Sequence, residues 1–353
     1  MNTEKLNFYD IEHEDLEQEF VLWGEPRYRA TQVWDGVYRQ LKTNFEDISN
    51  IPRDLRSRLS AKYSLQNLIA EVNLDSSDQQ TSKTLFRMGD GNAIETVLMR
   101  YKNRRTLCIS SQSGCALGCV FCATGQMGLK RNLSSGEIVE QVMVFERSLH
   151  QEDSGLTNIV VMGMGEPFHN YERTLEAIDR LNHPAGLNIG ARRFTVSTVG
   201  LVPQIRRFSM EKRQVNLAVS LHAADDELRN SILPINKKYP LSDLFDACQD
   251  YVEQTRRRIT FEWALIEGVN DSQDQAAKLT GLIGGMLSHV NLIPLNPTGG
   301  YQGIGSSQQK AQQFKTYLEH NGIPCTIRVR RGIDIHAGCG QLATIRDQSG
   351  DTL

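Results

Sequence analysis

Short apolar segments alternate with amphipathic stretches through most of this chain. Runs of four to eight mostly apolar residues, bounded by polar or glycine-containing turns, predict buried strands. We expect them at Thr106–Ser111, Ile159–Met162, Phe194–Ser197, Val215–Ser220, Ile259–Ile266, Val290–Leu295 and Cys325–Val329. Between them, apolar residues at helical spacing predict helices at 134–148, 171–181, 241–256, 274–287 and 306–321. Strand then helix, repeated about six times, predicts a parallel α/β sheet closed or nearly closed into a barrel.

The first 82 residues have a different, helical pattern. One helix opens after Pro26 and carries Val33, Trp34, Val37 and Tyr38 at helical spacing, and a second opens at Ile51-Pro52. We interpret Trp34 and Tyr38 as the core of this module. Residues 75–82 are polar and predict a linker, and a strand pair with a turn at 89–92 follows it. The predicted organisation is a helical N-terminal domain (1–82), a short β extension (83–104), the barrel (105–343) and a C-terminal tail (344–353).

Composition and charge indicate a large enzyme that does not span a membrane. The 353 residues are 39% hydrophobic and 23% charged, and they contain no uninterrupted apolar run long enough to span a bilayer. Residues 1–20 lack the basic and apolar regions of a secretory signal, so we expect a cytoplasmic protein. They carry a net charge of −6; removing it from the total of −3 leaves +3 for the rest. Basic residues in this remainder cluster at Arg104-Arg105, Lys130-Arg131, Arg192-Arg193, Lys237-Lys238, Arg256–Arg258 and Arg328–Arg331.

Three cysteines carry the strongest chemical signal. The spacing is Cys115-x-x-x-Cys119-x-x-Cys122. A structural zinc site needs four protein ligands, whereas a [4Fe-4S] cluster on three cysteines leaves one iron open to a further ligand. The alternative is a zinc knuckle completed by Cys108 or a histidine, although zinc sites usually pair two short C-x-x-C units. The spacing therefore favours a cluster with a reactive iron.

Polar motifs follow the predicted strands where a barrel places its chemistry. They are Cys115 after the first strand, Gly163–Pro167 after the second, Ser197–Gly200 after the third, Ser220–Ala223 after the fourth and Asn296-Pro297 after the sixth. Any one of them could be an ordinary turn or helix cap. Together they predict one site at the carboxyl ends of the strands.

Two further cysteines have positions that suggest chemistry. Leu107 and Ile109 form the apolar face of their strand, so Cys108 should point to the other side, into the barrel. Cys339 lies in a glycine-flanked segment near the chain end that could fold over the barrel mouth. A buried, inert thiol is the commonest alternative for a free cysteine, and we expect it for Cys248 and Cys325.

The cysteine motif and its surroundings, Ser111-Gln-Ser-Gly-Cys-Ala-Leu-Gly-Cys-Val-Phe-Cys-Ala-Thr-Gly125, resemble the cluster loop of radical S-adenosylmethionine (SAM) enzymes, and within them the RlmN/Cfr family of RNA adenosine methyltransferases. The resemblance runs from about Trp23 to Ala343. It implies a partial (β/α)6 barrel, a [4Fe-4S] cluster on Cys115, Cys119 and Cys122, and an N-terminal domain that holds RNA, for which Arg27, Arg29 and Arg39 would form the surface.

The same resemblance implies roles for the remaining site residues. SAM would contact Gly165, Glu166, Ser197, Ser220, Leu221, His222 and Asn296. Cys339 matches the cysteine that accepts a methyl group, Cys108 the one that resolves the protein–RNA thioether through a transient disulfide, and Glu95 a proton acceptor. The family usually has two alanines before the methyl-accepting cysteine, whereas this chain has Ala337-Gly338.

The implied reaction is a ping-pong methylation of RNA that consumes two SAM molecules per turnover. The resemblance favours the RlmN branch, which methylates C2 of a 23S rRNA adenosine in the peptidyl-transferase centre and of an adenosine in tRNA anticodon loops. The Cfr branch, which methylates C8 of the same rRNA base, is the alternative. A different class, a non-catalytic metal-binding ribosome-assembly factor, also stays open. We expect a monomer that receives electrons from a flavodoxin or ferredoxin.

Overall fold

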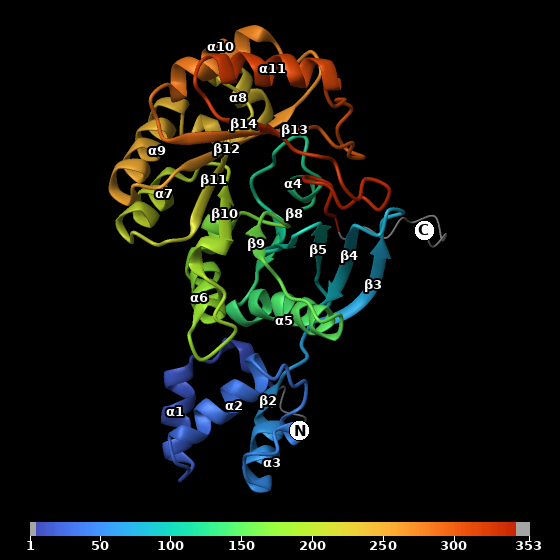
Figure 1. Ribbon diagram of the computed structural model, residues 1–353, viewed down its shortest axis with the longest axis vertical. Coiled ribbons are helices and arrows are strands. Elements are labelled where there is room, and N and C mark those ends of the chain that lie inside the picture. The colour runs from blue at the N-terminus through green and yellow to red at the C-terminus, as the bar shows by residue number, and fades with distance from the viewer. Residues whose placement is uncertain (1–4, 344–353) are drawn as a thin grey trace.

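One ten-stranded sheet forms the centre of the molecule (Figure 1). We describe it from a computed structural model that covers residues 5–343. Seven strands run parallel to one another and in chain order: β6 (Arg104–Ile109), β9 (Asn158–Val161), β10 (Phe194–Thr198), β11 (Asn216–Ser220), β12 (Ile259–Leu265), β13 (Ser288–Pro294) and β14 (Cys325–Ile327). All seven predicted strands are present with ends shifted by no more than two residues. The predicted α/β barrel is confirmed.

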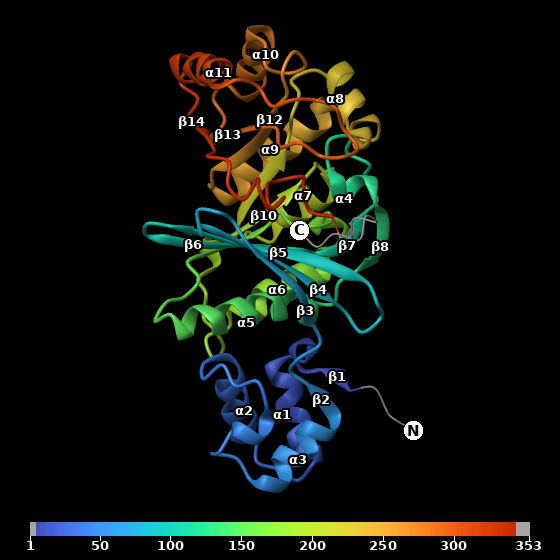
Figure 2. The ribbon, with the colours of Figure 1, turned by 90° about the vertical axis from the view of Figure 1, so that its right-hand side faces the viewer.

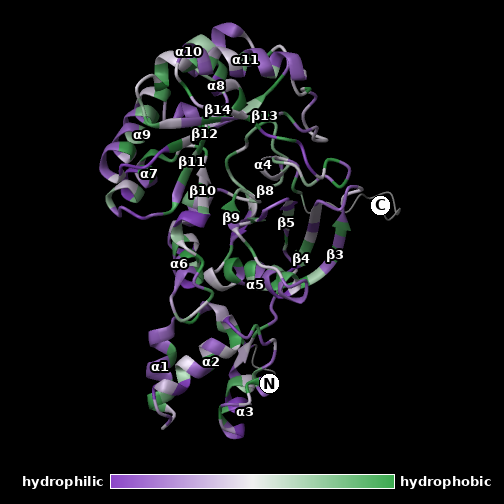
Figure 3. Ribbon diagram, in the orientation of Figure 1, coloured by the Kyte–Doolittle hydropathy of each residue, from purple (hydrophilic) through white to green (hydrophobic). Residues whose placement is uncertain are grey.

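Helices cover the convex face of this curved sheet (Figure 1). They are α5 (Ser135–Gln151), α6 (Tyr171–Asn182), α7 (Val202–Met210), α8 (Asp226–Ile232), α9 (Leu241–Thr255), α10 (Gln273–Ile283) and α11 (Gln308–His320). The Ser134 hydroxyl accepts from the Glu137 amide and the Glu137 carboxylate accepts from the Ser134 amide, which forms a capping box at the start of α5. Hydrophobic and hydrophilic residues alternate along the outer helices (Figure 3). Each helix therefore has a hydrophobic side, which it buries on the sheet.

Three antiparallel strands extend the sheet beyond β6: β5 (Ala93–Tyr101), β4 (Thr81–Arg87) and β3 (Ile69–Asp75). This corrects the predicted organisation in one respect. Residues 69–75 form β3 and residues 81–82 already belong to β4, with a turn at 76–80 between them, so this stretch is not the end of a helical domain and a linker. The strand β3 lies at the sheet edge with nearly all its side chains exposed, so it lacks the apolar run that marks the inner strands.

The N-terminal domain is a separate helical layer below α5 and α6 (Figure 2). It contains α1 (His13–Leu22), α2 (Tyr28–Tyr38) and α3 (Arg53–Lys62), with a short parallel pair of β1 (Leu6–Asn7) and β2 (Tyr63–Ser64). Trp34 and Tyr38 are at most 1% exposed, which confirms that they belong to its core.

Two charged side chains fix this domain to the barrel. The Asp10 carboxylate accepts from the Ser134 and Ser135 hydroxyls at 2.9 and 3.1 Å and from the Gly136 amide at 2.6 Å, at the N-terminal end of α5. That end carries the positive pole of the helix dipole and favours a carboxylate. From α6, the buried Arg180 donates to the Tyr9 carbonyl and pairs with Glu12. The domain is therefore held by polar contacts to the first turn of α5 and to the buried Arg180 of α6.

No helix within residues 5–343 is long and apolar enough to cross a membrane.

Candidate active site

The three motif cysteines lie in a loop that starts at a small hairpin. Strand β7 (Gln112–Cys115) pairs with β8 (Gly128–Asn132), Cys115 ends β7, and Cys122 directly precedes the short helix α4 (Ala123–Gln126). Gly114 in β7 has φ of +74°, and a Cβ atom there would lie 1.9 Å from the Gly128 carbonyl oxygen. Only glycine fits that position without a shift of the backbone.

All three thiols line one cavity of about 220 Å³ at the carboxyl ends of the strands. None of them is in a disulfide. Burial raises the pKa of the Cys115 thiol to about 12 and also raises the pKa values of Cys119 and Cys122. Three thiolates that are buried or half-buried in one cavity need a compensating positive charge, which a bound metal group supplies.

A [4Fe-4S] cluster binds each of its thiolates to a different iron. Three cysteine thiols that line one cavity suit such a cluster and leave its fourth iron open to a further ligand.

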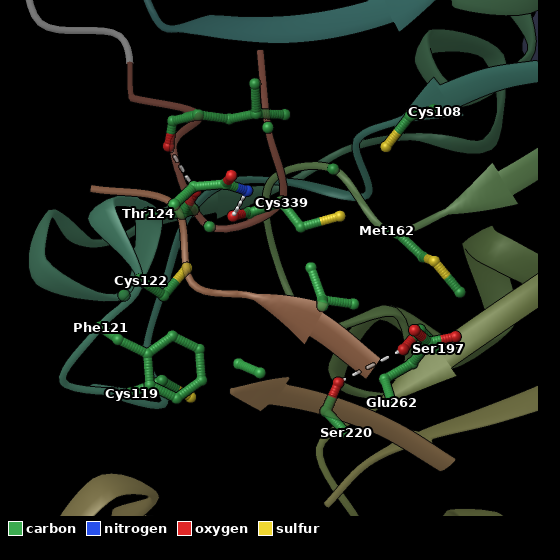
Figure 4. Close-up of a pocket in the computed structure, with 18 of the residues that line it drawn as sticks. Cys108, Cys119, Phe121, Cys122, Thr124, Met162, Ser197, Ser220, Glu262 and Cys339 are labelled. Carbon is green, nitrogen blue, oxygen red and sulfur yellow. Dashed lines mark hydrogen bonds between the residues drawn. The ribbon is translucent and has the colours of Figure 1, made fainter. Parts of the chain in front are cut away.

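Cys108 and Cys339 line the same cavity from opposite sides (Figure 4). Their sulfur atoms point toward each other across it, Cys108 from β6 and Cys339 from the C-terminal segment. Burial, with a smaller contribution from Cys339, raises the pKa of the Cys108 thiol to about 12. The alternation along β6 therefore predicted the direction of Cys108. Cys248 and Cys325 are buried, as expected, and neither lines this cavity.

The segment that carries Cys339 is fixed across the cavity by its backbone. The side-chain amide of Asn296 donates through Nδ2 to the Cys339 carbonyl at 3.1 Å, and the Thr124 hydroxyl donates to the Leu342 carbonyl at 2.6 Å. The Ala123 amide donates to the Gly340 carbonyl at 2.8 Å. The C-terminal segment thus covers the carboxyl end of the barrel beside the cysteine loop.

Six of the seven residues predicted to contact SAM line this cavity: Gly165, Glu166, Ser197, Ser220, His222 and Asn296. Leu221 does not; its side chain is fully buried and its amide donates to the Glu262 carbonyl. The hydroxyl oxygens of Ser197 and Ser220 lie 3.5 Å apart, side by side on neighbouring strands (Figure 4).

The Glu166 carboxylate is buried and already bonded to the backbone. Its two oxygens accept from the Phe168 amide at 3.0 Å and the Val199 amide at 2.9 Å. Burial raises its pKa to about 7, against the effect of these two bonds. Glu166 thus connects the loops after β9 and β10 and still faces the cavity.

His222 is a neutral ring with a defined tautomer. Burial lowers its pKa to about 3, and Nδ1 accepts from the Ala264 amide at 2.8 Å. The proton of the neutral ring is therefore on Nε2. The ring also contacts Phe121 of the cysteine loop edge-on, with centroids 4.9 Å apart.

The Glu95 side chain in β5 is buried rather than exposed to solvent. Its carboxylate pairs with Lys83 at 3.0 Å and accepts from the Ala343 amide at 3.0 Å. Glu95 does not line the cavity; it contacts the end of the Cys339 segment. Its role as proton acceptor stays a prediction.

The basic residues named from the sequence, those expected to face RNA and those in the other clusters, have mixed positions. Arg27 and Lys130 are exposed. Arg131 instead pairs with Asp90 and Glu137, and Arg39 donates to the Gly186 carbonyl across the domain boundary. Arg131 and Arg39 are therefore structural contacts rather than a free basic surface.

Sequence reasoning missed Glu262, which is 4% exposed and lines the cavity. The signal was available. In β12, Ile259, Phe261, Trp263 and Leu265 share one face, so Glu262 must share the other with Thr260 and Ala264.

Comparisons with known proteins agree with this geometry. A model of the radical SAM superfamily matches residues 109–280, and a model described as the ribosomal RNA large subunit methyltransferase N-terminal domain matches residues 6–65. A crystal structure of a radical SAM methyltransferase from Sphaerobacter thermophilus superposes with a TM-score of 0.93 at 49% identity, covering 96% of this chain and 99% of that one. The fold and site are therefore those of a radical SAM methyltransferase.

Two curated relatives narrow the class further. Dual-specificity RNA methyltransferase RlmN 1 of Myxococcus xanthus is 47% identical over 98% of this chain and 97% of its own. A probable dual-specificity RNA methyltransferase RlmN of Chloroflexus aurantiacus is 45% identical over 96% of this chain and 93% of its own. The chain belongs to the RlmN family of radical SAM RNA methyltransferases, whose superfamily uses a [4Fe-4S] cluster and SAM.

Proposed function

We propose that this enzyme methylates C2 of an adenosine in the peptidyl-transferase centre of 23S rRNA and in tRNA anticodon loops. The observation that carries the proposal is the pair of thiols, Cys108 and Cys339, that face each other in the cavity of the cluster cysteines. The dual-specificity names of the relatives support the two RNA substrates.

Cys115, Cys119 and Cys122 would hold the cluster, and Gly165, Glu166, Ser197, Ser220, His222 and Asn296 would surround SAM beside it. When bound, these groups supply a methyl group and an adenosyl radical that abstracts hydrogen. Two SAM molecules are used per turnover.

The protein's own residues then divide the work between two thiols. The Cys339 sulfur takes a methyl group, and this S-methyl group, after losing a hydrogen atom, bonds through its carbon to adenine C2. Loss of one electron, which the oxidised cluster would take back, and of the C2 proton, for which Glu95 is the proposed acceptor, leaves a thioether. The Cys108 thiolate attacks the Cys339 sulfur, a disulfide forms, and the released methylene carbon takes a proton to become the methyl group.

A reductant must return the Cys108–Cys339 disulfide to two thiols with two electrons. We propose a flavodoxin or ferredoxin as the electron donor, and an enzyme that acts as a cytoplasmic monomer.

The experiment is to purify Cys108→Ala and Cys339→Ala variants from cells, digest with ribonuclease and search by mass spectrometry for a nucleotide on the Cys339 peptide. Cys108→Ala should carry the adduct, because the thioether forms and lacks the thiol that breaks it. Cys339→Ala should carry none.

A Cys119→Ala variant should lose iron and SAM cleavage, whereas Cys325→Ala, a buried cysteine outside the cavity, should keep both. Equal adduct in the two active-site variants, or none in Cys108→Ala with a full cluster, would refute the assigned roles. Analysis of the modified nucleoside distinguishes C2 from C8.

A further inference from the structure

Several arginines immediately precede barrel strands. Arg104 opens β6, Arg192 lies just before β10, and the run Arg256–Arg258 ends directly before β12. Parallel strands begin at one edge of the sheet, so residues that precede them gather at the same end of the barrel. This is the end opposite the cysteine loop.

A polar cavity of about 800 Å³ lies at that end. Six arginines line it, and Glu262 is the single acidic residue among its lining residues in the described chain: Arg104, Arg192, Arg256, Arg257, Arg258 and Arg328. A concentration of positive charge in a chain with a net charge of −3 indicates an anionic ligand.

Most of this charge is not neutralised by the protein. Across residues 5–343, only Arg328 of the six is near a carboxylate, at 3.6 Å from Glu262. Arg192 and Arg257 donate to uncharged amides, while the exposed side chains of Arg256 and Arg258 make no hydrogen bond to the described residues. Guanidinium groups without carboxylate partners are free to bind phosphates.

The arginine cavity leads to the reacting thiols. Tyr101, Met162, Glu262 and Arg328 line both it and the active-site cavity. Where the two meet, Thr106 Oγ1, two residues before Cys108 on β6, is buried without a hydrogen-bond partner. The buried Glu262 Oε2 also makes no hydrogen bond, and its ion-pair partner Arg328 lies 3.6 Å away. Buried polar atoms without hydrogen bonds are costly in a folded protein, so both positions favour a polar ligand in the lumen.

An aromatic stack stands at the junction of the cavities. The guanidinium groups of Arg104 and Arg331 lie 4.3 and 4.4 Å from the centre of the Tyr101 ring. Bases of single-stranded RNA stack on aromatic rings and on guanidinium planes. The two guanidinium groups cover the Tyr101 ring, so a base would stack on a guanidinium plane rather than on the ring itself, a contact that a small inorganic anion does not make.

We propose that the RNA strand reaches the active site through this arginine-lined end of the barrel, with its phosphates on the arginines and its target base in the lumen. The inference rests on the proposed function. The opposite end is covered by the Cys339 segment, which is hydrogen-bonded to Asn296 and to the cysteine loop. An acidic electron-transfer protein is a less suitable ligand for the arginine-lined cavity, because the cluster cysteines lie at the other end of the barrel.

The test uses cluster-loaded protein and a single-stranded RNA oligonucleotide that contains the target adenosine. Arg256→Glu/Arg258→Glu should weaken binding by about tenfold or more. It should also reduce the slope of log affinity against log salt by about 1.4, because two phosphate contacts are lost. Arg256→Lys/Arg258→Lys should retain the slope.

The matched control is Arg206→Glu/Lys315→Glu, which makes the same change of charge on the outer helices α7 and α11 and breaks one exposed and one half-buried surface ion pair. It should leave both quantities unchanged. Equal iron content and melting temperature verify that every variant is folded. The proposal would be overturned if Arg256→Glu/Arg258→Glu left the RNA affinity and its salt dependence unchanged. An equal effect of the control variant would also overturn it.

Adduct trapping separates this inference from the proposed function. If Cys108→Ala traps RNA equally well with and without the added Arg256→Glu/Arg258→Glu change, the proposed RNA route is wrong and the proposed function stands. If Cys108→Ala traps no RNA at all, both fail. Loss of reduction by flavodoxin with normal RNA binding would assign this face to the reductant and refute the RNA route.

Discussion

Lys83 Nζ lies 3.0 Å from Glu95 Oε1, and each partner also holds the segment that carries Cys339. Lys83 donates to the His336 carbonyl at 3.3 Å, before Cys339, and Glu95 accepts from the Ala343 amide at 3.0 Å, after it. Both side chains are at least nine-tenths buried. One buried ion pair therefore fixes both ends of the segment that would carry the methyl group.

We predict that Lys83→Met lowers RNA methylation by about tenfold or more while the cluster is retained. The change leaves Glu95 buried without its counter-charge, so the carboxyl group takes up a proton and its hold on the segment weakens. Alkylation of Cys339, followed by mass spectrometry, should become faster. Arg87→Met is the matched control on the same strand, because its pair with Glu71 is more exposed. Equal alkylation rates in both variants would contradict the prediction.

Gly114→Ala should cost the enzyme most of its iron. The residue has positive φ, which costs about 1–2 kcal/mol for alanine, and the added Cβ would meet the Gly128 carbonyl at 1.9 Å. The hairpin must then shift, and Cys115 shifts with it. Gly128→Ala has a similar φ but no atom within 4 Å of the new Cβ, so it isolates the clash from the backbone cost. Iron content after anaerobic reconstitution measures the difference, and equal loss in both variants would exclude the clash as its cause.

Arg180→Met should destabilise the junction between the N-terminal domain and the barrel by about 3 kcal/mol. The Arg180 side chain is only 1% exposed, and its loss leaves the Tyr9 carbonyl and the Glu12 carboxylate without their donor. Arg173→Met on the same helix breaks an exposed pair with Glu176 and should change stability by less than about 0.5 kcal/mol. Urea unfolding provides both values, and the interpretation fails if the two variants unfold alike.

His222 should make stability sensitive to mild acid. Its pKa is about 3 in the folded protein and about 6.5 when unfolded, because burial disfavours the charged ring. Its contribution is fully present above pH 6.5 and is lost as the pH falls toward 3. Between pH 7 and pH 4 the loss is about 3 kcal/mol.

His222→Gln should remove this part of the pH dependence, measured as the free energy of unfolding at the two values. His320→Gln, at the exposed end of α11, should preserve it. A His222→Gln profile parallel to that of the original protein would show that another group is responsible.

Local patterns in the sequence predicted most of the barrel and the direction of Cys108. Alternation within a strand depends only on neighbouring residues, so it can be read directly from Leu107, Cys108 and Ile109. The same alternation would have identified Glu262 as a lumen residue.

Contacts between distant residues could not be read in this way. Arg131 looked like a free basic residue because its partner Asp90 is 41 positions away, and Arg39 because it meets a carbonyl 147 positions away. The strand β3 was missed because an exposed edge strand lacks the buried apolar run of a central one. Pairing and burial of such residues depend on the folded topology.

The strand β6 has two backbone edges, and both are used: β9 pairs with one and β5 with the other. The last parallel strand, β14, therefore finds no free row of amides and carbonyls on β6 with which to complete a ring. Ring closure is prevented by hydrogen-bond pairing itself, whatever the number of strands. The antiparallel extension thus leaves β14 and β3 as the two free edges of the sheet, and the wall of the barrel stays open between them.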